Sequence, residues 1–451
     1  MRASIQLGAT LPAVIVSIAG CSLTNRIDAC ETQASEIRIN QAADLFEELD
    51  TSTAAALLDD GDIVVAYTAH DALQSDGLPT KSEVRIVIFD PETGQRRALC
   101  ESGEYERTIS PDGVFARNPS VVSTPIALGS ISQGDDGPRA AAAVAWIEGT
   151  TVGNSTVLVQ FLDYAGCPLR LPFSPSYPDL PLYGASLAWS EPKQAFLAAY
   201  SNGTDVLTSW HSDNEGAAAT KVGAETRVSR VSMAIAEDGR GIVAWVGFAT
   251  GTALTESRLT TRVALLDADG AVREGPFAVD LPGQYWSAEG TMSLALAASR
   301  TRYAIATDLA QSIDGRHSVQ IVELDAETGE PLLPPWAAED DLNDATVHPS
   351  LAYLPDDSLL VAWESDAHNG TVARLFDAST SKPRFSSIAC NEESFPVGAR
   401  RMDAAPGMVS SLLASERVLV VHSGKPSYDA NGVGVVAWGL PFSKLWPAAS
   451  N

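Results

Sequence analysis

The stretch Val231-Ser-Met-Ala-Ile-Ala-Glu-Asp-Gly-Arg-Gly-Ile-Val-Ala-Trp245 contains the pattern that decides the fold of this chain. A Ser- and Ala-containing apolar run is followed by an Asp-Gly turn and then by a strongly apolar run that ends in an aromatic residue. Asp favours tight turns because it bonds to its own backbone, and Gly favours them because it adopts positive φ. The stretch therefore predicts two neighbouring strands that are apolar on both faces.

The same pair of runs occurs in several places along the chain, with a spacing of roughly 50 to 60 residues, which is a repeat architecture. Because each pair is apolar on both faces, each must be covered by neighbours on both sides. The copies are Ala54–Leu58 with Ile63–Tyr67, Pro119–Ser123 with Ala141–Trp146, Ala185–Trp189 with Ala195–Tyr200, Val231–Ala236 with Gly241–Trp245, Met292–Ala297 with Tyr303–Thr307, Pro349–Leu354 with Ser358–Trp363, and Val409–Ala414 with Arg417–His422.

A second recurring feature follows each pair. A third run alternates between polar and apolar residues, as in Val84–Ile88, and ends in an apolar residue, an Asp and a later Gly. We expect this turn to join a third strand to a fourth. Four strands at this spacing are typical of a β-propeller blade. The turns are Phe89-Asp90 with Gly94, Leu162-Asp163 with Gly166, Leu266-Asp267 with Gly270, Leu324-Asp325 with Gly329, the degenerate Ser212–Gly216, and Phe376-Asp377 without its Gly.

The two ends of the repeat region predict how the ring closes. The last copy continues through Gly432–Leu440 and then lacks a fourth strand, whereas Glu36–Asn40 precedes the first copy without a partner. Glu36–Asn40 is similar to Glu225–Ser229, which we place in the outer-strand position before the fourth copy. The predicted fold is therefore all-β: a seven-bladed β-propeller of four-stranded blades in which the N-terminal strand completes the last blade.

The repeats resemble bacterial propeller repeats that read "P-s-v-a…dG…v-v-a-W…v…fD…G", over Glu36 to Leu440. The Asp-box of sialidases, the paired glycines of Kelch repeats and a recurring Trp-Asp dipeptide are absent from the sequence. Tandem β-sandwiches are the alternative architecture, but the spacing is short for sandwich domains of about 100 residues.

The N-terminus has the layout of an export signal: Arg2 precedes an apolar stretch, Leu7–Gly20, that is too short to span a membrane as a helix. Its end, Ile18-Ala19-Gly20-Cys21, resembles the lipobox of bacterial lipoproteins. The resemblance implies cleavage before Cys21 and acylation of its sulfur and amine, which would hold the protein on a membrane. Ser22 in place of Asp implies sorting to the outer membrane. A simple secretory peptide is the alternative.

These features divide the chain into four expected regions. Residues 1–20 are the expected signal peptide, 21–35 the lipidated Cys and a flexible tether, 36–445 the propeller, and 446–451 a C-terminal tail. The expected location is the bacterial cell envelope, anchored by lipid to the outer membrane.

The remaining four cysteines suggest two disulfides, because the number is even and the chain is expected to be exported. Cys100 and Cys167 are expected near the outer strands of adjacent blades. Cys30 precedes the closing strand, and Cys390 is expected in the outer region of the neighbouring sixth blade. We therefore predict the pairs Cys100–Cys167 and Cys30–Cys390, each linking two blades.

The charge of the chain limits the classes of molecule that it can bind. The chain has 57 Asp and Glu against 30 Lys and Arg, a formal net charge of −27. Nucleic acid is therefore excluded as a general partner, because its recognition needs Lys and Arg to replace counterions. Contact with a membrane is expected only through the lipid anchor. We expect a monomeric protein whose partner is a protein or a glycan.

Acidic residues and histidines follow the second strand of most repeats, where propeller loops gather on one face around the central channel. They could form a carboxylate-lined funnel for a cation or a basic or sugar ligand, or simply the solvated rim of a very acidic protein. The candidate funnel residues are His70, Asp71, Glu148, Asp205, Asp308, Glu364, Asp366 and His422.

No cofactor is expected, with a bound Ca²⁺ as the alternative. Asp267–Gly270 and Asp59–Asp62 resemble pieces of Ca²⁺ loops, but neither continues to the Glu that an EF-hand requires, and hairpin turns explain both. The sequence also contains no G-x-S-x-G, H-E-x-x-H or P-loop motif, so no catalytic residue is assigned. Two functions remain: a binding or scaffolding platform on the cell envelope, and a hydrolase or lyase of extracellular polysaccharide that uses funnel carboxylates.

Overall fold

The structure is a computed structural model that describes residues 35–38 and the strands and short turns between 53 and 441. The main gaps are 71–81, 128–138, 150–154, 176–183, 213–217, 249–258, 282–292, 311–316, 339–345, 366–369, 378–408 and 425–433. Side chains are described only between residues 53 and 377. In this part of the chain, no helix has the length and hydropathy that crossing a membrane requires.

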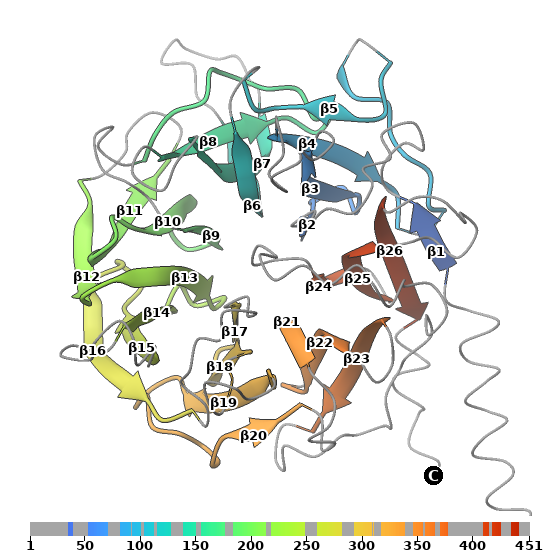
Figure 1. Cartoon of the computed structure of the whole chain (residues 1–451). Helices are drawn as coiled ribbons and strands as arrows, with labels where there is room; N and C mark the ends of the chain where they lie inside the picture. The colour runs from blue at the N-terminus through green and yellow to red at the C-terminus, as the bar shows by residue number, and fades with distance from the viewer. Residues whose placement is uncertain are drawn as a thin grey trace, which may run out of the picture.

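The described strands form seven antiparallel sheets that follow one another around a ring (Figure 1). Sheets 1 to 6 are numbered here in chain order. The first three comprise β2 (Thr53–Leu57), β3 (Ile63–His70), β4 (Ser82–Phe89) and β5 (Arg107–Thr108); β6 (Ala116–Ala127), β7 (Arg139–Glu148) and β8 (Thr156–Leu162); and β9 (Ala185–Ser190), β10 (Ala195–Ser201), β11 (Asp205–His211) and β12 (Thr220–Ala224).

The next three sheets continue the ring. They comprise β13 (Val228–Ile235), β14 (Gly241–Phe248), β15 (Leu259–Leu266) and β16 (Val272–Val279); β17 (Leu294–Ala298), β18 (Arg302–Thr307), β19 (Gln320–Asp325) and β20 (Trp336–Ala337); and β21 (Thr346–Tyr353), β22 (Leu359–Ser365) and β23 (Gly370–Phe376). In each sheet the first strand lies nearest the centre of the ring (Figure 1).

The prediction of a ring of uniform four-stranded blades is wrong. Sheets 1 to 6 have three or four strands each, because sheets 2 and 6 contain three strands in the described residues. After β8 the chain makes only single bridges, Val159 with Phe173 and Leu162 with Pro168. Proline has no N–H to donate to a ladder, and the side-chain amide of Gln160 donates to the carbonyl of Arg170 instead, at 2.6 Å.

The two ends of the chain meet in the remaining sheet. It combines β24 (Val409–Ala414), β25 (Arg417–Gly424) and β26 (Gly434–Pro441) with β1 (Ser35–Arg38), which pairs antiparallel with β26. The N-terminal strand thus lies where the sequence places it. The comparison behind that placement was partly wrong, however: the outer strand before sheet 4 is β12, and Val228 already belongs to the inner strand β13.

The Asp-Gly turns have the predicted geometry. Gly94, Gly166, Gly270 and Gly329 all have positive φ, between 70° and 78°. In each turn the preceding Asp accepts backbone N–H groups with its side chain; Asp267, for example, accepts those of Asp269 and Ala271 at 2.9 Å each. The Asp-Gly pattern is therefore explained by turn chemistry.

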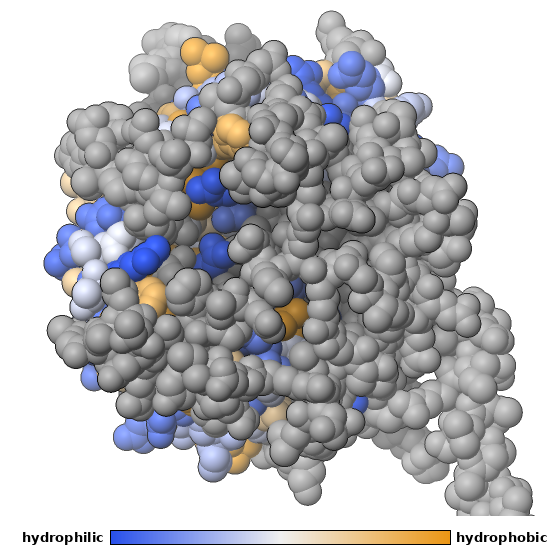
Figure 2. Space-filling model, in the orientation of Figure 1, coloured by the Kyte–Doolittle hydropathy of each residue, from blue (hydrophilic) through white to orange (hydrophobic). Residues whose placement is uncertain are grey.

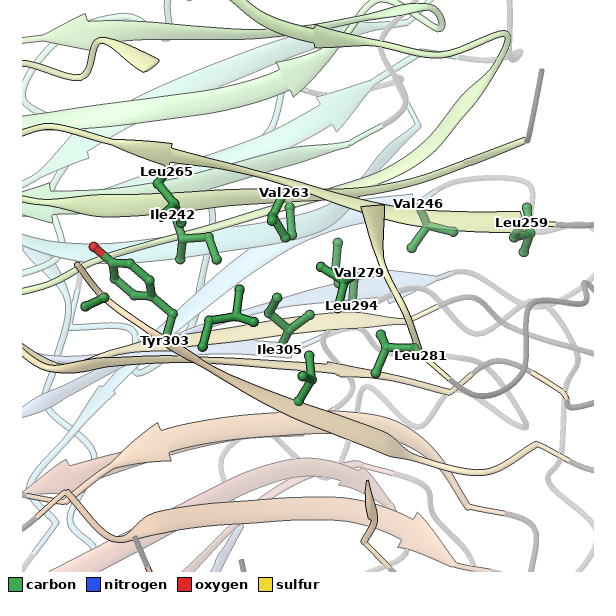
Figure 3. Close-up of a cluster of buried hydrophobic side chains, with 14 of the residues drawn as sticks. Ile242, Val246, Leu259, Val263, Leu265, Val279, Leu281, Leu294, Tyr303 and Ile305 are labelled. Atoms are coloured by element: carbon green, nitrogen blue, oxygen red, sulfur yellow. The ribbon is translucent and has the colours of Figure 1, made fainter. Parts of the chain in front are cut away.

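The hydrophobic core consists of separate layers between adjacent sheets. Figure 3 shows the layer between sheets 4 and 5, where Ile242, Val263 and Leu265 face Tyr303 and Ile305. Equivalent layers lie between the other neighbours from sheet 1 to sheet 6. Three of them contain a fully buried tryptophan from the second strand of a sheet: Trp146, Trp245 and Trp363.

One predicted disulfide is confirmed. Cys100 and Cys167 are bonded, with Cα atoms 5.2 Å apart, and the bond joins the segment between β4 and β5 to the turn after β8. It therefore links sheets 1 and 2, as the sequence predicts. The other predicted pair, Cys30 and Cys390, lies outside the described residues and stays a prediction.

The inner strands are joined by serine side chains. Ser120 Oγ in β6 accepts the backbone N–H of Leu187 in β9 at 3.1 Å, and Ser186 Oγ in β9 accepts that of Met233 in β13 at 3.1 Å. Adjacent inner strands belong to different sheets and form no ladder with each other. These serines therefore supply acceptors for N–H groups that face the gap between two sheets.

We predict that Ser186→Ala lowers the free energy of unfolding by about 1–3 kcal/mol, because the N–H of Met233 loses its acceptor in a partly buried position. Urea unfolding measures the change. The control is Ser123→Ala, since Ser123 only donates to Ala141 within its own sheet, at 3.5 Å. Equal losses in the two variants would contradict the role of Ser186 between sheets.

A second prediction concerns His211, which lies between sheets 2 and 3. Its ring packs against Phe196 and Phe173, with centroids 5.3 and 5.5 Å away, and its Nε2 lies 2.7 Å from Ser209 Oγ. Burial, and secondarily the charge of Arg170, lowers the pKa of His211 from 6.5 to about 4. As the pH falls, the unfolded chain therefore binds a proton at His211 before the folded chain does. The contribution of His211 to the free energy of unfolding is fully present above pH 6.5 and is lost as the pH falls toward 4.

Between pH 7 and pH 5 this histidine should contribute a loss of about 2 kcal/mol in unfolding free energy. We predict that His211→Phe, which keeps a ring in the aromatic cluster, removes that part of the pH dependence. Urea unfolding of both proteins at the two pH values tests it. An unchanged difference between pH 7 and pH 5 in the variant would show that other groups cause the acid sensitivity.

Candidate functional site

The first residues of five inner strands converge on a cavity of about 220 Å³ at the centre of the ring. Figure 2 shows one face of the ring, where blue, hydrophilic residues and some orange, hydrophobic ones are visible between the grey atoms. Among the described residues that line the cavity none is aromatic, and roughly half are polar or charged. The lining residues are Thr53, Ala54, Ala55, Asn118, Pro119, Ser120, Val121, Gly184, Ala185, Ser186, Arg230, Val231, Ser232 and Leu294.

Three serines occupy equivalent places in this wall: Ser120, Ser186 and Ser232. The first two accept a backbone N–H from the next inner strand. A hydroxyl that accepts such a bond keeps its own hydrogen for donation. The wall therefore offers O–H donors to a molecule in the cavity.

Asn118 stands at a distorted point of β6. Its φ is +55°, Pro119 follows it, and the pairing of β6 with β7 shifts register between Arg117 and Ser120. Such bulges redirect side chains relative to the regular strand. Asn118 Oδ1 is buried and accepts no hydrogen bond from the described residues. The residue lines the cavity, while its Oδ1 lies beneath the cavity surface.

Arg230 supplies positive charge to the same wall. Its side chain is surrounded by protein yet keeps partial exposure to the channel. Burial lowers the pKa of Arg230 to about 10; the carboxylate of Asp308 opposes this shift and the guanidinium of Arg117 adds to it. Burial also lowers the pKa of Arg117. The carboxylate of Asp308 and the guanidinium of Arg117 therefore both act on Arg230.

Asp308 connects the inner strands beside this cavity. The residue is fully buried. Its Oδ1 accepts the backbone N–H of Ser293 at 2.7 Å, and its Oδ2 accepts that of His348 at 3.1 Å. Since His348 belongs to β21, the carboxylate joins sheet 5 to sheet 6. Both oxygens of Asp308 therefore have a structural role.

Two further predicted carboxylates lie at the same end of the strands. Glu364, the penultimate residue of β22, pairs with His348: its Oε2 is 3.1 Å from His348 Nδ1. Glu148 ends β7 opposite Ala116 at the start of β6. Burial raises the pKa of Glu148, and the indole of Trp146 opposes that shift.

The other predicted funnel residues fall elsewhere. Asp205 forms an ion pair with Lys221 of the outer strand β12, with Oδ1 and Nζ 2.7 Å apart, so its carboxylate is engaged away from the inner strands. His70 ends β3 and His422 lies in β25, but their side chains are outside the described residues, as are Asp71 and Asp366.

Sequence reasoning missed Arg117, Asn118, Arg230 and His348. The candidate residues all follow the second strands, whereas these four residues lie at the start of the inner strands. The sequence nevertheless contains a signal for three of them. Asn118, Arg230 and His348 each come two residues before the recurring Ser of the inner strand, a position whose residue type changes from repeat to repeat. Because the residue at this position differs between repeats while the rest of the pattern recurs, the position can hold a functional side chain without disturbing the strand.

Neither Ca²⁺-like segment is arranged as a metal site. Asp60 and Asp62 form ion pairs with Arg97, and Asp267 accepts the N–H groups of its own turn. Throughout the described part of the chain, no group of three or more His, Cys, Asp or Glu residues is placed to hold a metal ion.

Comparison with solved structures finds chains that are similar to this one at low sequence identity. The chain is similar to a protein of unknown function from Dyadobacter fermentans, with 12% identity, a TM-score of 0.48 and coverage of 91% of this chain and 98% of that one. An α-L-arabinanase of Penicillium chrysogenum complexed with arabinobiose matches with 11% identity, a TM-score of 0.44, and 90% and 98% coverage. The propeller domain of the trilobed protease of Pyrococcus furiosus matches with 10% identity, a TM-score of 0.43, and 90% and 99% coverage.

These similarities concern the fold alone, which hosts both binding proteins and hydrolases. No protein family and no curated protein matches the sequence.

Proposed function

We propose that this protein is a lipid-anchored protein of the bacterial cell envelope whose propeller binds a small part of a glycan, peptide or protein in its central channel. The observation that carries the binding role is the polar cavity of about 220 Å³ formed by the inner strands of five sheets. Its hydroxyl donors come from different sheets. The ring therefore holds them at fixed distances before any ligand arrives, which reduces the entropic cost of binding.

The binding role is favoured over hydrolysis because the carboxylates near the cavity are engaged. Both oxygens of Asp308 accept backbone N–H groups, and Glu364 pairs with His348. Hydrolysis of a glycosidic bond usually needs two carboxyl groups that flank the bond, one of them with a raised pKa. Among the described carboxylates at this end of the strands, Glu148 has a raised pKa, whereas Asp308 and Glu364 bond to other groups of the protein.

The anchor is supported by the lipobox-like Ile18–Cys21 and by the apolar stretch before it. We predict that the full chain, expressed in a bacterial host, fractionates with membranes and incorporates labelled palmitate. Cys21→Ser should abolish the label and release the protein, whereas Cys30→Ser should retain both. A wild-type chain that carries no label would contradict lipid anchoring.

The binding role is tested with the full chain in detergent on an array of bacterial and plant oligosaccharides and short peptides. We predict that Ala55→Phe, which fills part of the cavity, weakens the observed binding at least tenfold. The control Leu171→Phe adds a ring at a position that is 86% exposed and should leave binding unchanged. The milder Ala55→Leu provides a second test if the Phe variant unfolds.

Two results would overturn the binding proposal. One is binding that Ala55→Phe and Ala55→Leu leave intact in folded protein, because the ligand would then lie outside the channel. The other is release of reducing sugar from an array oligosaccharide by the wild type but not by Glu148→Gln, which would establish the hydrolase.

A further inference from the structure

The two ends of the ring carry different connections. At one end, which we call the turn end, tight turns join the first strand of a sheet to the second and the third to the fourth, as residues 236–240 and 267–271 do in sheet 4. At the opposite end, which we call the channel end, the inner strands begin and the cavity lies. The connections from second to third strands at the channel end include the long segments 71–81 and 249–258. Long connections are where binding residues are often found.

Polar contacts between neighbouring sheets cover the turn end. Lys193 of sheet 3 forms an ion pair with Asp269 of sheet 4, with Nζ and Oδ1 3.0 Å apart. Arg240 of sheet 4 pairs with Glu327 of sheet 5 and donates to the backbone carbonyl of Arg300 at 3.1 Å. The turn end is therefore a polar surface of short turns that are fixed to one another. Such a surface can lie next to lipid headgroups without rearranging.

The register of β1 shows at which end the chain enters the ring. β26 is the third strand of its sheet, counted from the innermost strand β24, and β1 is the outermost (Figure 1). A third strand runs from the channel end to the turn end. β1 is antiparallel to β26: its first residue, Ser35, lies opposite Gly439. Its last residue, Arg38, lies opposite Val436. The chain therefore enters β1 at the turn end.

The expected lipid anchor, Cys21, precedes this entry point closely in the sequence. Residues 22–34 separate it from Ser35, and a segment of this length spans at most about 50 Å when fully extended. An eight-residue strand such as β3 is about 26 Å long. If the channel end lay on the membrane, the tether would have to run along the whole side of the ring. That path uses more than half of its reach and restricts its conformations, which costs entropy.

We propose that the tether holds the propeller with its turn end toward the membrane, so that the channel end faces away from the lipid. The partner of the turn end is the headgroup layer of the bilayer that carries the acyl chains, and the channel receives its ligand from the aqueous side. The inference rests on the lipid anchor of the proposed function and adds the orientation of the anchored protein.

Energy transfer from single sites of the protein to the membrane tests this orientation. The full lipidated chain, purified in detergent, is added to phosphatidylcholine vesicles that contain phosphatidylethanolamine labelled with rhodamine on its headgroup. A coumarin amino acid replaces one exposed residue at a time: Glu237 or Asp269 at the turn end, and Thr226 or Thr204 at the channel end. Glu237 and Thr226 form a matched pair, because they lie beyond opposite ends of β13. Thermal unfolding confirms that each labelled chain is folded.

We predict at least twofold more energy transfer from the turn-end sites than from the channel-end sites, because the turn end lies nearer the headgroups. Tether length is tested by inserting a Gly-Ser linker, which behaves as a flexible coil, between Gln33 and Ala34. The insertion should bring the ratio of energy transfer from Glu237 and Thr226 close to one. The same linker added after Asn451 is the control and should leave the ratio unchanged.

Several results would overturn the inference. Equal transfer from both ends of the vesicle-bound protein, or more from the channel end, would refute the orientation and leave the anchor intact. A ratio that the inserted linker does not change would show that the tether does not set the orientation. A Cys21→Ser chain that binds vesicles as well as the wild type would refute the anchor itself and this inference with it. Ligand binding in the channel is measured independently with Ala55→Phe, so the failures are distinguishable.

Discussion

The structure depends on how adjacent inner strands are held together without sharing a sheet. Each sheet completes its own backbone ladder, and the N–H groups that face the next sheet need acceptors from side chains. Ser120 and Ser186 provide them for Leu187 and Met233. At another boundary the carboxylate of Asp308 does the same for His348. These contacts set the distance between inner strands and hence the width of the central channel.

The apolar layers between the sheets complement these polar contacts. Trp146, Trp245 and Trp363 are fully buried in three different layers, where their large rings fill the widening space between second strands. Hydrophobic burial is not directional, so it does not by itself determine which inner-strand residue meets which. The side-chain acceptors near the axis are directional, and they add that specificity.

The same geometry explains the chemistry of the channel. Because each inner strand begins at the same end of the ring, single residues from sheets 2, 4 and 5 approach one another although they are far apart in the sequence. The charges of Asp308 and Arg117 thereby act on the pKa of Arg230, in opposite directions. A cavity formed in this way is lined by groups that several sheets hold at fixed positions. Such preorganisation lowers the entropic cost of binding a ligand.

Local features of this protein could be predicted from the sequence. The strand pairs and Asp-Gly turns follow from hydrophobic period and turn chemistry, which act over a few residues, and the Cys100–Cys167 bond followed once the strands were ordered. The number of strands in each sheet did not follow, because Pro168 and the side chain of Gln160 in β8 replace part of a ladder that the repeat pattern implied. Glu148, Asp308 and Glu364 could be placed at one end of the strands. That Arg117, Asn118 and Arg230 share a cavity was decided only by the closed ring, since the distance between residues in different sheets depends on how all the sheets pack.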